Sequence, residues 1–355
     1  MNAVTPIRAA VDVALADGSE ARAWDAYVDA APEAGFFHRW GWGEVARAAY
    51  GHEPVRLVAR EEGGITGVLP LVDVKSPLLG RALISSAFTV GGGVAADNAH
   101  AAAALADASI EQGRRLGARY VELRGAHAAF PFWKTKKGVY AGFCKAIPED
   151  EAENLAMIPR KRRAEIRKAL AAAESGALRV RYDGEADAFY ALYARSMRDH
   201  GTPVFPKRYL REILRHFRNE TEIAVVDHEG EPVAALVSFY FRDRVMPYYA
   251  GAAPAARKTR ALDYLYWMQM RRAVTRGARL FDFGRSKYGS GAFDYKTYWG
   301  FEPVALEYQY ALLDARETPN VNPDNPKFSM AARVWRRLPL PLANALGPLA
   351  ACNFA

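Results

Sequence analysis

A basic, glycine-rich and aromatic stretch close to residue 290 has the side chains best suited to chemistry in this sequence. Residues 281–291 read FDFGRSKYGSG, and residues 295–301 read YKTYWGF. The glycines let the backbone turn sharply at the end of an expected strand, and Arg285, Lys287 and Lys296 surround that turn with positive charge. Functional side chains concentrate in such loops, so the sequence predicts a site here. The alternative is a glycine-rich surface loop with incidental cations.

Two further polar features accompany this stretch. The carboxylate of Asp282 either orients an arginine or lysine of the site or is a paired carboxylate at a strand end. Residues 257–260 (RKTR) open a helix expected over residues 257–276. Because cations oppose the helix dipole at an N-terminus unless an anion joins them, this segment predicts an anion site. A solvated basic turn is the alternative.

Two aromatic segments are candidates for substrate contact. Residues 36–42 (FFHRWGW) place His38 and Trp40 among other aromatic rings before a helix, where a histidine has either a functional or a purely structural role. Residues 201–206 (GTPVFP) predict a rigid loop after a helix. Thr202 and Phe205 in that loop suit the wall of a pocket, and a plain connection between two helices explains the segment equally well.

The elements that must position these residues occur twice in the same order: three strands, one long helix and one strand. The first copy is expected at 55–60, 65–74, 81–90, 99–116 and 119–124, and the second at 222–227, 232–242, 245–251, 257–276 and 279–283. The tripeptide GAR closes both helices, with Gly117 and Gly277 fitting a position that requires positive φ. An internal duplication is the simplest explanation.

A cation-rich helix is expected between the two copies, beginning at Pro159 and reaching Leu170. Its apolar residues, Ile166 among them, can face a core while its lysines and arginines stay solvated. Phosphate binding is the other interpretation of the same cations.

Composition narrows the functional classes. The chain has 355 residues, a formal charge of +8 and only two cysteines, so anionic partners are plausible and a disulfide scaffold or zinc knuckle has no support. No Ser/His/Asp triad, P-loop or metal-ligand spacing occurs in the sequence. Acidic residues interrupt the N-terminus before any apolar stretch of export length. We therefore expect a cytoplasmic protein without a spanning helix and with no specific DNA partner.

Three antiparallel strands, a long helix and a further strand are the order of the GNAT acyltransferase unit, in which the helix N-terminus receives the phosphates of the acyl donor. The predicted fold is therefore α+β, with two tandem GNAT-like domains of mixed, mainly antiparallel sheets flanked by helices. We place these domains at residues 1–155 and 156–317, followed by a basic and apolar tail at 318–355.

At these residues the sequence resembles the FemAB family of acyl and aminoacyl transferases, and within it the branch associated with exosortase/PEP-CTERM systems. The resemblance covers nearly the whole chain, and its motifs are FHRW at 37–40, IPRKRR at 158–163, GTPVFP at 201–206, DFGRSK at 282–287, and NPK at 325–327 with LPL at 338–340.

The resemblance implies transfer of an acyl or aminoacyl group to an amine of a peptidoglycan or exopolysaccharide precursor. It implies no tightly bound cofactor and a phosphate-bearing donor, either acyl-CoA or aminoacyl-tRNA. The catalytic residues expected on this basis are Lys296, Arg285 and Asp282, with the cations stabilising the oxyanion or phosphate. The expected substrate-binding residues are Arg257, Lys258, Thr259, Arg260, Tyr249, Gly284, Ser286, Lys287, His38, Trp40, Thr202 and Phe205. The competing hypothesis is a non-catalytic envelope-assembly factor that binds a polyanionic glycolipid or nucleotide-sugar.

The C-terminal tail combines cations with apolar residues. Arg333, Trp335, Arg336 and Arg337 precede an apolar, proline-containing segment at 338–355. Such a segment can dock peripherally on the anionic inner membrane, or it can pack back onto the first domain.

Overall fold

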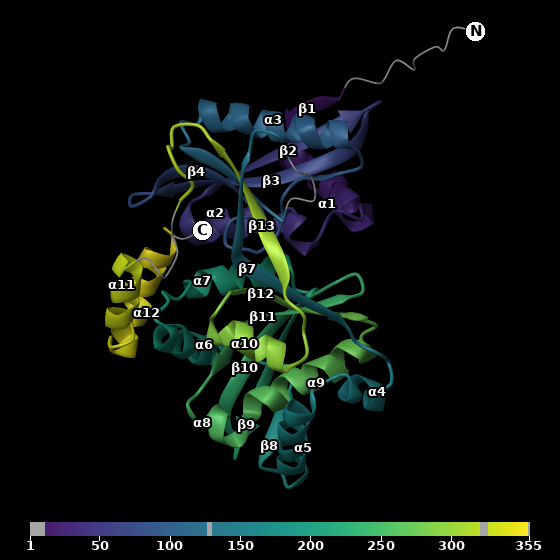
Figure 1. The fold of residues 1–355 in the computed structure, drawn as a ribbon, viewed down its shortest axis with the longest axis vertical. Helices are drawn as coiled ribbons and strands as arrows, with labels where there is room; N and C mark the ends of the chain where they lie inside the picture. Colours follow the sequence, from purple (N-terminus) through teal and green to yellow (C-terminus); the bar gives the residue numbers. More distant parts are fainter. Residues whose placement is uncertain (1–10, 126–129, 320–325, 354–355) are drawn as a thin grey trace, which may run out of the picture. The chain divides into compact units, whose positions relative to one another are not determined.

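The computed structural model describes residues 11–125, 130–319 and 326–353, drawn in colour in Figure 1. The chain divides into two compact units. The first contains residues 1–136 and 307–319, and the second contains residues 137–306 and 320–354.

The first unit is built on a sheet with the strand order β1-β2-β3-β4-β6-β13. Its strands are β1 (Asp12–Leu15), β2 (Glu53–Glu61), β3 (Gly64–Ser76), β4 (Gly80–Ser85), β6 (Tyr120–Arg124) and β13 (Val304–Leu312), and the short β5 (Ala95–Ala96) pairs with β3. Neighbouring strands are antiparallel except β4 and β6, which are parallel.

Helices cover both faces of this sheet (Figure 1). They are α1 (Ala21–Ala30), α2 (Gly41–Tyr50) and α3 (Ala99–Arg115), with short 3₁₀ helices at Gly18–Glu20 and Phe36–His38. The side chain of Asn98 caps α3 by accepting from two backbone N–H groups, and Gly117 follows the helix with a φ of 68°. Leu105 of α3 packs with Leu57 and Leu69 of the sheet, and all three are completely buried.

The second unit repeats this plan with the strand order β7-β12-β11-β10-β9-β8. Its strands are β7 (Lys134–Ala146), β8 (Leu178–Arg181), β9 (Thr221–His228), β10 (Glu231–Phe241), β11 (Arg244–Ala252) and β12 (Leu280–Lys287). Here the parallel pair is β11 and β12. Each unit therefore has one parallel pair, formed by the strands that flank its long helix.

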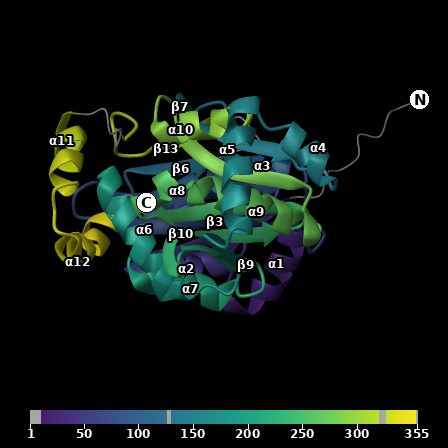
Figure 2. The ribbon, with the colours of Figure 1, turned by 90° about the horizontal axis from the view of Figure 1, so that it is seen from below.

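The helices of the second unit are α4 (Glu151–Ala156), α5 (Arg160–Glu174), α6 (Ala186–His200), α7 (Lys207–His216), α8 (Ala255–Thr259), α9 (Ala261–Thr275) and α10 (Gly291–Tyr298). On one face of the sheet, Ala169 of α5 and Leu265 of α9 pack with Leu236 of β10. Figure 2 shows α5 and α9 side by side. On the other face α6 approaches β11 so closely that a Cβ on Gly251 would lie 2.3 Å from the backbone nitrogen of Tyr193. Only glycine fits at that crossing.

The units exchange a strand, which corrects the expected domain boundaries at residues 155 and 317. Strand β7 follows the first copy in sequence but pairs antiparallel with β12 of the second unit. Strand β13 follows the second copy but pairs antiparallel with β6 of the first. Backbone hydrogen bonding across these pairs is what assigns each strand to its unit, and sequence order alone does not reveal it.

The duplicated element order is confirmed, with two local corrections. The expected strand 81–90 ends at Ser85, because the chain turns through Ser86 and Phe88 with positive φ. The expected helix 257–276 is interrupted at Arg260, whose φ of 59° lies in the left-handed region, so that two helices replace one. The cation-rich helix forms as expected, with Ile166 and Ala169 completely buried.

The C-terminal tail forms α11 (Pro326–Trp335) and α12 (Leu340–Ala351) and packs on the second unit, not on the first. A Cβ on Gly347 would lie 2.8 Å from Cγ1 of Val204, and Arg198 of α6 donates to the carbonyl of Leu338 at 3.1 Å. Among the residues with described structure, none of the helices is both long and apolar enough to cross a membrane.

Candidate active site

The candidate site is built on a bulge in β12. The antiparallel register with β7 shifts between Asp282 and Arg285, and Gly284 occupies the shift with a φ of 65°. The bulge turns the carbonyls of Gly284 and Arg285 toward Lys296 of α10, whose Nζ donates to them at 3.2 and 2.9 Å. Lys296 and the glycine turn, both singled out in the sequence, therefore lie in contact.

The ammonium of Lys296 lies in an unusual electrostatic setting. Burial lowers its pKa to about 7, with Asp282 opposing the shift and Arg285 adding to it. An ammonium has three N–H donors, and the two carbonyls use two of them. The third has no hydrogen-bond partner in the described parts of the chain. At neutral pH this group can change its charge and can donate to an incoming oxygen.

Asp282 shapes the bulge rather than facing an open site. Its Oδ2 accepts from Nη1 of Arg244 at 2.9 Å, and its Oδ1 accepts from the backbone N–H of Gly284 at 2.8 Å. Both carboxylate oxygens therefore accept hydrogen bonds. This arrangement fits the second of the two sequence interpretations, a paired carboxylate at a strand end. The geometry fits a positioning role for Asp282 in place of the catalytic role expected from the sequence.

The residues that follow the bulge alternate in burial. The guanidinium of Arg285 lies 4.7 Å from the ring centre of Tyr140, a cation–π contact across to β7. Ser286 is buried, and its hydroxyl has no hydrogen-bond partner within the described structure. Lys287 is partly exposed. The expected substrate-binding residues Gly284, Ser286 and Lys287 therefore lie on one strand, and Gly284 contacts Lys296.

A network that sequence reasoning missed fixes the helix carrying Lys296. The buried carboxylate of Asp263 in the first turn of α9 accepts from Arg162 of α5 at 2.6 Å and from the Tyr295 hydroxyl at 3.0 Å. Burial raises the pKa of Asp263, although Arg162 opposes the shift. Three helices are tied together at one carboxylate, so Lys296, next to Tyr295, is held in place. The sequence signal that could have revealed this network is Asp263 itself, an acidic residue among apolar residues at the start of a helix.

The basic segment 257–260 has a different setting from the one expected. Arg257 and Lys258 lie exposed in the last turn of the short α8, where the helix dipole favours cations without an added anion. The Thr259 hydroxyl donates to the carbonyl of Ala255 at 3.1 Å, and Arg260 pairs with Glu165 of α5. Arg260 is also the N-cap residue of the longer α9, so the anion site expected at this segment stays a prediction.

Tyr249 and Phe205 come together in an aromatic cluster. The Tyr249 hydroxyl hydrogen-bonds that of Tyr209 at 3.1 Å, and the Phe205 ring centre lies 6.1 Å from that of Tyr249. Burial raises the pKa of Tyr249 well above its usual value. Thr202 is exposed and belongs to the turn that ends α6.

His38 and Trp40 belong to the first unit and are tied to its backbone. His38 is buried, its Nδ1 accepts from the N–H of Gly35 at 3.0 Å, and its Nε2 lies 3.0 Å from the carbonyl of Gly93. The Trp40 ring lies under the guanidinium of Arg56 at 3.7 Å. These contacts fit structural roles for both residues, in place of the substrate contacts expected from the sequence.

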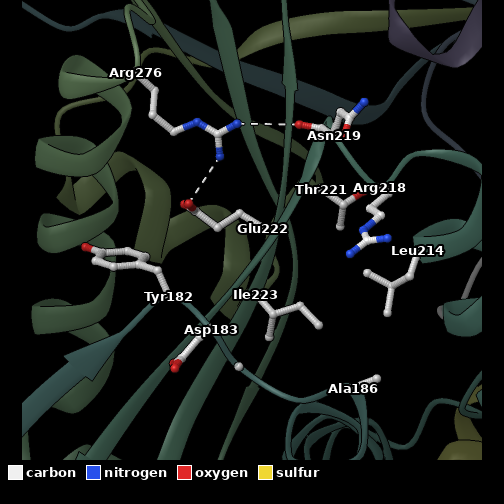
Figure 3. A pocket seen from close by; sticks show the side chains of 11 residues that line it. Tyr182, Asp183, Ala186, Leu214, Arg218, Asn219, Thr221, Glu222, Ile223 and Arg276 are labelled. Carbon is white, nitrogen blue, oxygen red and sulfur yellow. Dashed lines mark hydrogen bonds and ion pairs between the residues drawn. The ribbon is translucent and has the colours of Figure 1, made fainter.

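A pocket of about 640 Å³ lies at the opposite end of the same sheet (Figure 3). Thr221, where β9 begins, lines it, whereas Lys296 contacts the carboxyl end of β12. The pocket is therefore separate from the candidate site. Of the pocket's two lining arginines, Arg276 pairs with the buried Glu222 at 3.1 Å, whereas Arg218 forms no ion pair within the described residues.

The two central strands of each unit pair only briefly before they diverge. In the described structure, β11 and β12 share two register pairs, and so do β4 and β6. These pairs are Arg244 with Leu280, Val245 with Phe281, Leu83 with Val121 and Ile84 with Glu122. A gap between diverging strands leaves unpaired backbone groups that an extended ligand can use.

Comparison with known protein families and solved structures identifies the fold that carries this candidate site. Residues 160–297 match the family model of an acetyltransferase (GNAT) domain. The solved structure of FemX superposes with a TM-score of 0.67 at 14% identity, covering 85% of this chain and 98% of FemX. A tandem GNAT protein from the clavulanic acid biosynthesis pathway superposes with a TM-score of 0.54 at 11% identity, covering 87% and 100%. The chain has a tandem GNAT fold.

The expected tandem GNAT architecture is thus confirmed, and the fold of the chain is similar to that of FemX. A third structure similar to this chain is the C-terminal domain of a putative lysylphosphatidylglycerol synthetase from Agrobacterium fabrum, with a TM-score of 0.51 at 13% identity over 90% of this chain and 95% of that domain. No curated protein matches the chain in sequence.

The lowered pKa of Lys296 predicts a pH-dependent cost to stability. The folded pKa is about 7 and the ordinary value is 10.5, so between these values the unfolded chain binds the extra proton and stability rises with pH. Lys296→Met should therefore raise the free energy of unfolding by roughly a few kcal/mol more at pH 6 than at pH 10. Urea unfolding at both pH values measures this difference, with the exposed Lys161→Met as control. An equal effect at both pH values would contradict the prediction.

Proposed function

We propose that the chain is an N-acyltransferase of FemAB type that transfers an acyl or aminoacyl group to an amine of a cell-envelope precursor. The observation that carries the proposal is the half-buried Lys296 ammonium at the β12 bulge, with one N–H donor left over and a pKa of about 7. It contacts β12, the strand that diverges from β11. The acetyltransferase (GNAT) domain match over residues 160–297 supports acyl transfer at this place.

In the proposed reaction a neutral amine attacks the carbonyl carbon of a thioester or ester directly. The nitrogen lone pair forms the new C–N bond, and the carbonyl electrons move onto oxygen. The Lys296 ammonium donates its third N–H to that oxyanion, which lowers the barrier because the charge develops beside a preorganised cation. The oxyanion then collapses, the bond to sulfur or oxygen breaks, and the proton lost by the attacking nitrogen passes to the leaving group, which departs as a free thiol or alcohol. No covalent enzyme intermediate is needed.

Several features support the choice of substrates. A thioester donor suits the gap between β11 and β12, so acyl-CoA is the first donor to test and aminoacyl-tRNA the second. The likeness in fold to FemX favours an envelope-precursor acceptor. Peptidoglycan and exopolysaccharide precursors, both implied by the sequence resemblance, are the two acceptor classes to test.

Two experiments, donor binding and then turnover, test this proposal. Acetyl-CoA, longer acyl-CoAs and aminoacyl-tRNA are each added to the purified protein, and a ligand that binds only the folded state raises the melting temperature. The stabilising donor is then mixed with amino sugars, nucleotide-linked sugars and a peptidoglycan nucleotide precursor, and release of free CoA thiol or deacylated tRNA is followed. We expect release that depends on an acceptor amine. Binding without release would favour the non-catalytic assembly factor.

A further inference from the structure

The C-terminal helices carry an apolar surface that no described part of the chain covers. The inner side of α12 is buried through Ala343, Gly347 and Ala351. The opposite side exposes Leu342, Leu346 and Leu349, which are four and three residues apart, and Leu349 is 70% exposed. Residues at this spacing share one helix face. Figures 1 and 2 both show α12, in yellow, beside α6.

Helix α11 extends the apolar surface. Met330 and Val334 are four residues apart, and each is 59% exposed. Five large apolar side chains are therefore exposed on two consecutive helices. This concentration of exposed large apolar side chains at one end of the chain is typical of an interaction site.

The charges on the two helices are all of one sign. Residues 326–353 include Lys327, Arg333, Arg336 and Arg337 but no aspartate or glutamate. The three arginines are exposed, and none forms an ion pair within the described ranges. The partner of this surface should therefore be anionic as well as apolar.

We propose that α11 and α12 dock on the surface of an anionic lipid bilayer. The arginines would meet the phosphate head groups while the exposed leucines enter the boundary with the acyl chains. Helix α12 has 12 residues, a length of about 18 Å, and a bilayer core is about 30 Å thick, so the helix lies in the surface plane. A second copy of this chain fits less well, because its matching patch would bring cations against cations.

Vesicle co-sedimentation tests the proposal with the full chain. We expect binding to vesicles containing about a third phosphatidylglycerol, no binding to pure phosphatidylcholine, and release at high salt. Two triple variants, Leu342→Gln/Leu346→Gln/Leu349→Gln and Arg333→Gln/Arg336→Gln/Arg337→Gln, should each weaken partitioning about tenfold or more. Their melting temperatures should not change, because the replaced side chains are exposed. Deleting α12 is a poorer test of membrane binding, because α12 covers Val204 and its removal would also expose that buried side chain.

Matched controls separate this surface from a general charge effect. Arg22→Gln/Arg114→Gln/Arg115→Gln removes the same formal charge from exposed positions of the first unit, and Leu78→Gln removes a leucine that is 66% exposed. Both controls should bind like the unchanged protein. Equal loss in the controls, no binding of the full chain to anionic vesicles, or a dimer in solution that the leucine variant dissociates would each overturn the proposal. The assay needs no acyl donor, so its outcome is independent of the proposed function.

Discussion

Replacing Lys296 by methionine is expected to lower kcat/KM for acyl transfer about 10²- to 10³-fold, the range found when one oxyanion donor is removed. Methionine keeps the length and apolar stem of lysine but loses the three N–H donors. The measurement is initial-rate release of the leaving group with the donor and acceptor identified by binding. Lys161→Met, an exposed lysine of α5, is the control and should leave the rate unchanged.

The pH dependence of a second variant tests the charge at this position. As pH rises through about 7, Lys296 loses its proton, whereas the guanidinium of Lys296→Arg stays charged. The ratio of the arginine variant's rate to the unchanged enzyme's rate should therefore rise between pH 6 and 8.5. Taking the ratio cancels the titration of the attacking amine. A ratio that falls with pH would show that Lys296 acts as a base and would overturn the oxyanion role.

Glu122→Gln is expected to destabilise the first unit by about 3–5 kcal/mol, because it leaves Arg124 charged and buried without its partner. Nε of Arg124 donates to Oε1 of Glu122 at 2.6 Å, and both residues are almost fully buried. Burial opposes the charge on Arg124, but Glu122 and Tyr308 outweigh it and raise its pKa. Urea unfolding measures the loss.

An exposed pair in the same unit is the matched control for this prediction. Glu111 and Arg115 of α3 are about two-thirds exposed, so Glu111→Gln should change stability by less than about 1 kcal/mol. Replacing both buried partners with apolar residues, Glu122→Leu with Arg124→Met, should recover much of the lost stability. If Glu122→Gln costs no more than Glu111→Gln, the buried pair is not a stabilising contact.

Much of the fold was predictable because the relevant signals are local. The strand and helix order of each copy follows from periodicity in short windows, and Gly117 and Gly277 mark helix ends through a conformation that only glycine adopts easily. The pairing of Lys296 with the glycine turn was predictable for the same reason, since the two segments are separated by only a few residues. The repeated element order predicted the tandem arrangement, and the FemAB resemblance agreed with it.

The errors arose where distant contacts decide the outcome. The break at Arg260 changes the dipole environment of Arg257 and Lys258, and no glycine or proline marks it. His38 was ambiguous because its role depends on Gly93, which lies 55 residues away. Asp282 became a paired carboxylate only through Arg244 on the neighbouring strand.

The sequence by itself determined the elements, their duplication and the basic composition of the candidate site, since these depend on residue type and spacing along the chain. Only the tertiary structure decided that β7 and β13 complete the sheets of the opposite units, that Asp263 ties three helices behind Lys296, and that the tail packs on α6 with its leucines outward. These outcomes depend on hydrogen bonds and burial between residues far apart in sequence, and a lysine acquires a pKa near 7 only when such packing removes it from water.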